Sequence, residues 1–138
     1  MRKRLLMTLV ATFGVAGAAW TGEASAQSVE KPRVVEVKMV DKSPTSFAFE
    51  PANVTVRPGD VLRFRQIGAM PHNVEFREPP EGAELDSIRV GPFLVTKGQV
   101  YELTIDERFV VGQYPFVCTP HEQMGMTGLL EVKPETRK

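Results

Sequence analysis

The stretch RPGDVLRFRQI, Arg57 to Ile67, decides the fold class, because it joins a tight turn to a strand with one apolar face. Adjacent proline and glycine predict the turn. Leu62 and Phe64 then fall on one face of the predicted strand, while the arginines between and after them fall on the other. The alternation predicts a strand whose apolar face lies in a core.

Short strands with turns between them are predicted on both sides of this stretch as well. Further strands are predicted over residues 34–40, 46–56, 72–76, 100–105, 113–118 and 128–132. Seven or eight short strands, separated by Pro/Gly turns at intervals of about ten residues, predict an all-β sandwich of two sheets. Residues 77–88 lack a strand pattern, and we expect one helical turn there.

The N-terminus predicts a secretory signal peptide. A basic MRKR start precedes an apolar run, Leu5 to Trp20, and the small-residue site ASAQ. We expect cleavage after Ala26, which makes residues 1–26 the signal peptide and residues 27–138 one mature domain. The alternative is a retained membrane anchor, but the run is short for a bilayer span and is diluted by Gly and Ala. We therefore expect an exported, periplasmic or extracytoplasmic protein without stable membrane insertion after cleavage.

The charge balance argues against a nucleic-acid partner. The chain has 17 basic and 17 acidic side chains, and without Arg2, Lys3, Arg4 and Glu23 it keeps 14 basic and 16 acidic ones, a net charge of −2. No basic stripe stands out, so nucleic acid is not an expected ligand. We expect a monomer.

The residues with soft-metal-binding chemistry are few, and three of them lie close together in the sequence. Cys118, the single cysteine, begins the spacing C-x2-H-x4-M with His121 and Met126, and His72 is the other of two histidines. A lone cysteine cannot form an internal disulfide, and outside the cytoplasm a free thiol is exposed to oxidation. One thiolate, two imidazoles and one thioether suit a copper ion with a weak axial methionine, whereas zinc more often has further Cys or His ligands. The alternative is that each residue only packs.

Three segments of the chain resemble the cupredoxins, specifically their plastocyanin and pseudoazurin branch. They are FEPANVTVRPGDVLRF, MPHNVEF and YPFVCTPHEQMGMTGLLEV. The resemblance implies a Greek-key β-sandwich, one type 1 (blue) copper ion cycling between Cu(II) and Cu(I), and electron transport rather than enzymatic activity. The implied metal ligands are His72, Cys118, His121 and Met126. Met124 competes for the axial position, but the family's methionine follows its cysteine by eight residues, which selects Met126.

Two neighbours of the ligands have expected roles toward the bound copper. Asn73 resembles the family's asparagine that ties the two ligand segments together and donates its backbone N–H to the cysteine sulfur. Pro120 has no N–H, so position 120 cannot add a hydrogen bond to the sulfur. We expect this to keep the thiolate electron-rich and the reduction potential low.

The resemblance also implies an exit route for the electron and transient partners. In the family the loop histidine, here His121, carries the electron through an apolar patch. The expected patch residues are Met70, Pro71, Pro120 and Met124. They could equally pack the loop. Glu78, Glu81, Glu84 and Asp86 form an acidic segment that could steer a basic partner or simply be solvated. The expected partners are redox proteins such as cytochromes or copper reductases.

Two alternatives to electron transport are open to test. A copper carrier or chaperone would use the same ligands without redox turnover, and exposed Met-rich or His-rich tracts would favour it. A copper enzyme would need additional histidine ligands. With two histidines in total, the chain cannot supply a second, catalytic copper of that kind.

Overall fold

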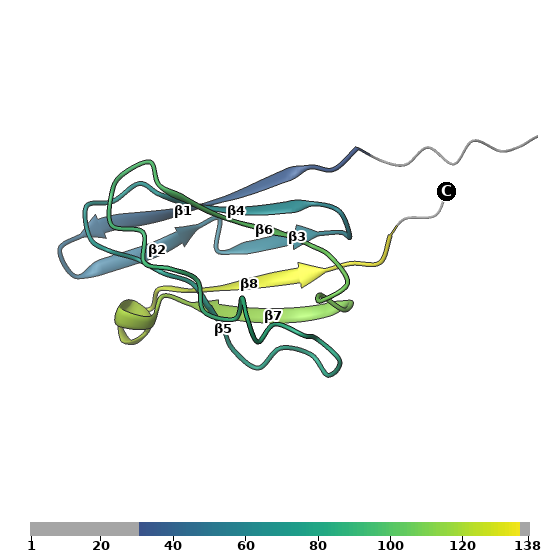
Figure 1. Cartoon of the computed structure of the whole chain (residues 1–138). Coiled ribbons are helices and arrows are strands. Elements are labelled where there is room, and N and C mark those ends of the chain that lie inside the picture. The colour runs from purple at the N-terminus through teal and green to yellow at the C-terminus, as the bar shows by residue number, and fades with distance from the viewer. Residues whose placement is uncertain (1–30, 136–138) are drawn as a thin grey trace, which may run out of the picture.

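The computed structural model describes residues 31–135, which form a sandwich of two four-stranded sheets (Figure 1). The predicted signal peptide and its cleavage site lie outside the described residues. The first sheet has the order β2-β1-β4-β6, with β1 Val34–Ser43, β2 Ser46–Glu50, β4 Val61–Gln66 and β6 Val100–Thr104. The second has the order β3-β8-β7-β5, with β3 Asn53–Val56, β5 Glu75–Phe76, β7 Gly112–Val117 and β8 Thr127–Val132.

Both sheets are mixed. β1 runs parallel to β4, and β3 runs parallel to β8, while the other neighbouring strands are antiparallel. Parallel neighbours need long crossover connections, so consecutive strands cannot all be joined by hairpins. The predicted all-β, Greek-key sandwich of seven to eight strands is confirmed.

The stretch that predicted the fold behaves as its alternation indicates. Leu62 and Phe64 are fully buried in β4, and the arginines between and after them are only partly buried. Phe116 of β7 lies at the centre of an aromatic cluster, with its ring edge-on to Phe49, Phe64 and Phe76 at centroid distances of 4.9, 5.4 and 6.2 Å. This cluster joins the two sheets directly below the end of β7.

Three predicted elements differ from the structure. The single strand expected over residues 46–56 is two strands in different sheets, since the chain changes sheet at Pro51, which has no N–H for a ladder. Of the strand expected over 72–76, β5 keeps two residues, and His72 forms an isolated bridge with Leu94 instead. Residues 77–88 form turns rather than the expected helical turn.

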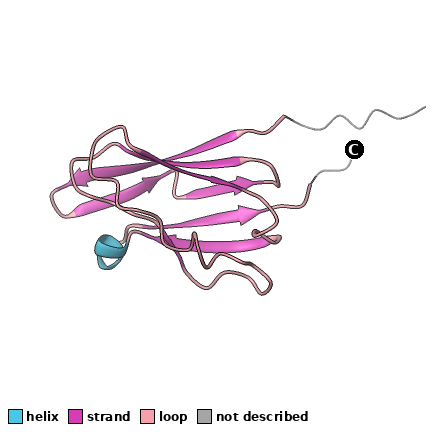
Figure 2. Ribbon diagram, in the orientation of Figure 1, coloured by secondary structure: helices cyan, strands magenta, loops and turns pink. Residues whose placement is uncertain are grey.

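The one helix among residues 31–135 is a 3₁₀ helix, η1 Thr119–Met124, between β7 and β8. It lies at one end of the sandwich, the end toward which β1 points (Figure 2). No helix in the described part of the chain is long and apolar enough to cross a membrane.

Candidate metal centre

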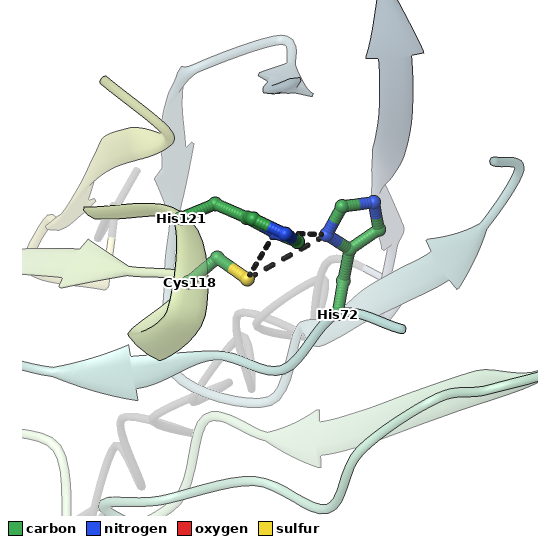
Figure 3. Close-up of side chains that lie close together, drawn as sticks. All are labelled: His72, Cys118 and His121. Carbon is green, nitrogen blue, oxygen red and sulfur yellow. Dashed lines mark hydrogen bonds between the residues drawn. The ribbon is translucent and has the colours of Figure 1, made fainter. Parts of the chain in front are cut away.

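Three of the predicted ligands meet at this end of the sandwich. His72, Cys118 and His121 are buried, and their ligand atoms all lie within 4.8 Å of one another. The Nδ1 atoms of the two histidines are 3.0 Å apart, and the Cys118 sulfur is 3.6 Å from Nδ1 of His72 and 3.4 Å from Nδ1 of His121 (Figure 3). The two imidazoles and the sulfur therefore face a common point.

The geometry of the loop after β7 explains how two ligands lie so close in sequence and in space. Cys118 precedes η1, Pro120 stands in its first turn, and Gly125 ends it with a left-handed backbone at φ 82°. The backbone N–H of Met126 donates to the carbonyl of His121, and that of Cys118 donates to the carbonyl of Met126. These bonds tie Cys118, His121 and Met126 into one closed loop.

The donor set fits a metal ion. A first-row metal ion bonds imidazole nitrogen at about 2.0 Å and thiolate sulfur at about 2.3 Å, which holds the ligand atoms at separations similar to those found here. Two histidines and one cysteine, converging through soft and intermediate donors in an apolar pocket, are typical of blue copper sites. Carboxylates, which hard cations prefer, are not among the three converging ligand atoms.

The two candidate axial methionines differ sharply in burial. Met126 is fully buried in the core, while Met124 is 52% exposed. Gln123, which lies between Glu122 and Met124 in η1 and whose amide oxygen could replace a methionine as a weak ligand of copper, is exposed as well. Met126 is therefore the methionine on the inner side of the loop.

Burial and backbone N–H groups act on the site in opposite directions. Burial raises the pKa of the Cys118 thiol, and hydrogen bonds from the backbone N–H groups of Asn73 and His121 partly offset this. Burial also lowers the pKa of His121, and the neighbouring His72 adds to this effect. The pocket therefore favours the neutral imidazole of His121, which is the form that binds a metal.

Asn73 links the two ligand segments by side-chain hydrogen bonds. Its Oδ1 accepts the backbone N–H of Thr119 at 2.8 Å, and its Nδ2 donates to the Thr119 hydroxyl at 2.9 Å. Pro120 follows Thr119 and is exposed. The backbone N–H of His121 donates to the Cys118 carbonyl at 3.0 Å and also helps to lower the pKa of the Cys118 thiol, an effect that the sequence does not predict.

Two other contacts of the ligands are absent from the sequence-based predictions. The ring of Phe47 stacks on His121 at a centroid distance of 3.9 Å and an interplanar angle of 24°. Asp41, at the far end of β1, places Oδ1 2.7 Å from Nε2 of His72. Burial raises the pKa of Asp41, but hydrogen bonds from the Met70 N–H, His72 and the Ala69 N–H outweigh this and leave the pKa below its ordinary value.

Neither the Phe47–His121 contact nor the Asp41–His72 contact can be predicted from the residues near it in the sequence. The alternation marks Phe47 as a core residue of a strand, and its position over a ligand depends on the packing of β2 against η1. Asp41 is 31 residues from His72. Only the pairing of β1 with β4 brings them together.

The residues of the predicted surface patch are exposed, but the histidine beneath them is more covered than expected. Met70, Pro71, Pro120 and Met124 are all exposed, and only 6% of the His121 surface reaches solvent. Two apolar residues that we did not predict, Phe93 and Val95, are 53% and 56% exposed on either side of Leu94, the bridge partner of His72. The acidic residues Glu78, Glu81, Glu84 and Asp86 are exposed too.

Comparisons with known proteins agree with this site. Residues 35–133 match the family described as copper binding proteins, plastocyanin/azurin family. A chloroplastic plastocyanin from Oryza sativa subsp. indica is 30% identical over 136 residues, which cover 95% of this chain and 86% of that protein.

Solved structures show the same relationship. Oxidised plastocyanin from Dryopteris crassirhizoma is 28% identical with a TM-score of 0.60, and the match covers 72% of this chain and all of that one. Pseudoazurin from Methylobacterium extorquens is 33% identical with a TM-score of 0.51, covering 76% and 78% of the two chains. The chain belongs to the plastocyanin/azurin family of copper-binding proteins and is a cupredoxin with one type 1 copper site.

Proposed function

We propose that the protein carries single electrons between exported redox proteins, with His72, Cys118, His121 and Met126 as the ligands of its copper ion. The observation that carries the proposal is the convergence of one thiolate and two imidazoles at a single buried point. Met126 would supply the thioether, because it is buried in the same loop while Met124 is 52% exposed. The bound copper supplies a one-electron couple between Cu(II) and Cu(I).

The protein's part is to hold the ligands still. Fast electron transfer requires small reorganisation, so ligand atoms must not move between the two oxidation states. The Thr119 hydrogen bonds of Asn73 tie the loop to the His72 segment, and the stacked ring of Phe47 restricts His121. The aromatic core beneath the loop adds stiffness, since packed interiors deform little.

The apolar surface around the site suits brief docking of a partner. An apolar patch without fixed ion pairs gives a small interface that separates again after transfer. The thin exposed edge of His121 is then the shortest route from the site to the partner. We propose that the partners are exported proteins such as cytochromes or copper reductases, and that the protein is an electron carrier rather than an enzyme.

The experiment that tests the proposal separates electron transport from copper delivery. The purified copper protein is cycled between ascorbate and ferricyanide with a strong Cu(I) chelator present. An electron carrier retains its copper and its spectrum over many cycles, because both oxidation states are held by the same rigid ligands. Loss of copper to the chelator in the first reduced phase would instead support a carrier or chaperone.

Met126 and Met124 form a matched pair that tests the axial ligand. Met126→Leu is expected to raise the reduction potential by tens of millivolts or more, since the axial donor tunes the potential and leucine donates nothing to the oxidised site. Met124→Leu is expected to leave the potential and the visible spectrum unchanged. Cyclic voltammetry measures both, and the opposite pattern would make Met124 the axial ligand.

Pro120 tests the hydrogen bonding of the sulfur. Pro120→Ala restores a backbone N–H at position 120, and a hydrogen bond to the thiolate is expected to raise the potential on the order of tens of millivolts. Pro115→Ala, at an exposed proline in β7, serves as the control and should not change it. An unchanged or lower potential for Pro120→Ala would show that the N–H groups of Asn73 and His121 already saturate the sulfur.

A further inference from the structure

The Nε2 atom of the buried His72 ring, on the side away from the other ligands, contacts a carboxylate. Nε2 of His72 is 2.7 Å from Oδ1 of Asp41, and the His72 side chain has no exposed surface. The second oxygen of Asp41 accepts two backbone N–H groups, from Ala69 at 2.7 Å and from Met70 at 2.9 Å. Asp41 thus holds both the imidazole and the loop that leads to it.

We propose that Asp41 is a positioning residue that fixes the tautomer and orientation of His72 and, through its negative charge, lowers the reduction potential of the site. This inference rests on the proposed function, since it takes His72 to be a metal ligand. It assigns to the end of β1 a part in tuning the copper site.

The tautomer follows from what each neighbour can donate or accept. An ionised carboxylate only accepts hydrogen bonds, so the Nε2 that faces Asp41 must carry the proton. The neutral ring then has its lone pair on Nδ1, which is the atom that faces the Cys118 sulfur and His121. A hydrogen bond of this kind also makes the imidazole a more basic ligand.

The surrounding chain is shaped around the carboxylate. A Cβ built on Gly68 would lie 2.1 Å from Oδ1, 2.3 Å from Cγ and 2.6 Å from Oδ2 of Asp41, so only glycine leaves room for it. The fully buried side chain of Gln66 donates to the carbonyls of Gly68 and Met70 and supports the same loop from inside. The carboxylate therefore occupies a fitted position rather than a chance surface contact.

The charge acts on one oxidation state more than on the other. Cu(II) with one thiolate has a net charge of +1, while the reduced site is neutral. A nearby negative charge stabilises the oxidised form, and partial burial strengthens this effect because the Asp41 side chain is 20% exposed. Lys42, the cation next to Asp41 in the sequence, is paired with Glu50 instead, with its ammonium 3.0 Å from that carboxylate.

Asp41→Asn tests the proposal, because the side chain keeps its size and loses its charge. The amide can accept a hydrogen bond on one oxygen only, so it cannot serve His72 and the loop N–H groups together. We expect the ratio of Cu(II) to Cu(I) affinity to fall about tenfold, which for one electron equals a rise in potential of about 59 mV. In the reduced, diamagnetic protein, the proton on Nε2 of His72 should exchange faster with water, as seen by NMR.

Glu50→Gln is the matched control, since it removes one negative charge from a half-exposed side chain of the same sheet. It should leave the His72 proton unchanged and shift the potential little, and salt should screen that shift. Gly68→Ala is the second test, because it keeps the charge but pushes the carboxylate away. It is expected to raise the potential and speed the same proton exchange even if Asp41→Asn does not fold.

The results separate the two hypotheses. A wild-type protein without a blue thiolate band would overturn the proposed function itself. A blue wild type whose Asp41→Asn and Gly68→Ala variants match Glu50→Gln in potential and in the exchange of the His72 proton would overturn only the role of Asp41.

Discussion

Replacing Cys118 with Ala is expected to abolish the intense blue absorption and the narrow copper hyperfine splitting that a type 1 site gives. The thiolate is the single sulfur donor of its kind in the chain, and the charge-transfer band arises from its bond to Cu(II). The change removes only one sulfur atom from the core, where Cys118 is fully buried, so the variant should still fold. It should bind copper weakly because the thiolate ligand is lost. Visible and electron paramagnetic resonance spectra of both proteins, loaded with Cu(II), measure the effect.

The same variant should lose the stabilisation that copper provides. A ligand present at about a thousand times its Kd stabilises a folded protein by about 4 kcal/mol. Wild type should gain on that order on addition of copper in a urea titration, and Cys118→Ala should gain almost nothing. Cys118→Ser controls for the small cavity, because it restores the volume with a hydroxyl that is a poor ligand for copper. A blue band in either variant would mean that the band does not arise from the Cys118 thiolate.

Most of the fold could be predicted from the sequence, because alternation reports burial directly. Leu62 and Phe64 face the core as their spacing indicates, and the strands at residues 34–40, 100–105 and 128–132 occur close to the predicted bounds. What alternation does not report is which sheet a strand joins. Val54 and Val56 alternate as Phe47 and Phe49 do, but out of phase with them, and they lie in the other sheet, since strand pairing depends on partners far away in the chain.

The site shows the same division between local and distant information. Cys118, His121 and Met126 are close in sequence, so their spacing alone is enough to predict a ligand loop. The roles of Asp41 and Phe47 depend on contacts across the sandwich and had no local signal. The residues that position the ligands are therefore harder to predict than the ligands, although they determine how rigidly the ligands are held.

The stability of the ligand loop depends on the core beneath it. Phe116 is two residues before Cys118, is fully buried, and contacts three aromatic rings from both sheets edge-on. On β8 it faces Gly128, where a Cβ would lie 2.3 Å from its ring and 2.6 Å from the carbonyl oxygen of Ala52. The Phe116 ring therefore fills the space between the two sheets and lies directly against β8, the strand that follows the loop.

Phe116→Ala is expected to lower the free energy of unfolding of the copper-free protein by about 3–5 kcal/mol, through lost burial and the cavity it leaves. Phe116→Leu keeps much of the apolar volume without the edge-on ring contacts and should cost less. Urea titrations without copper measure both, and reduction potentials follow on the copper-loaded proteins. If Phe116→Ala unfolds like wild type, the cluster does not determine stability. If stability falls while the potential is unchanged, the hydrogen bonds of the loop, rather than the core, hold the ligands in position.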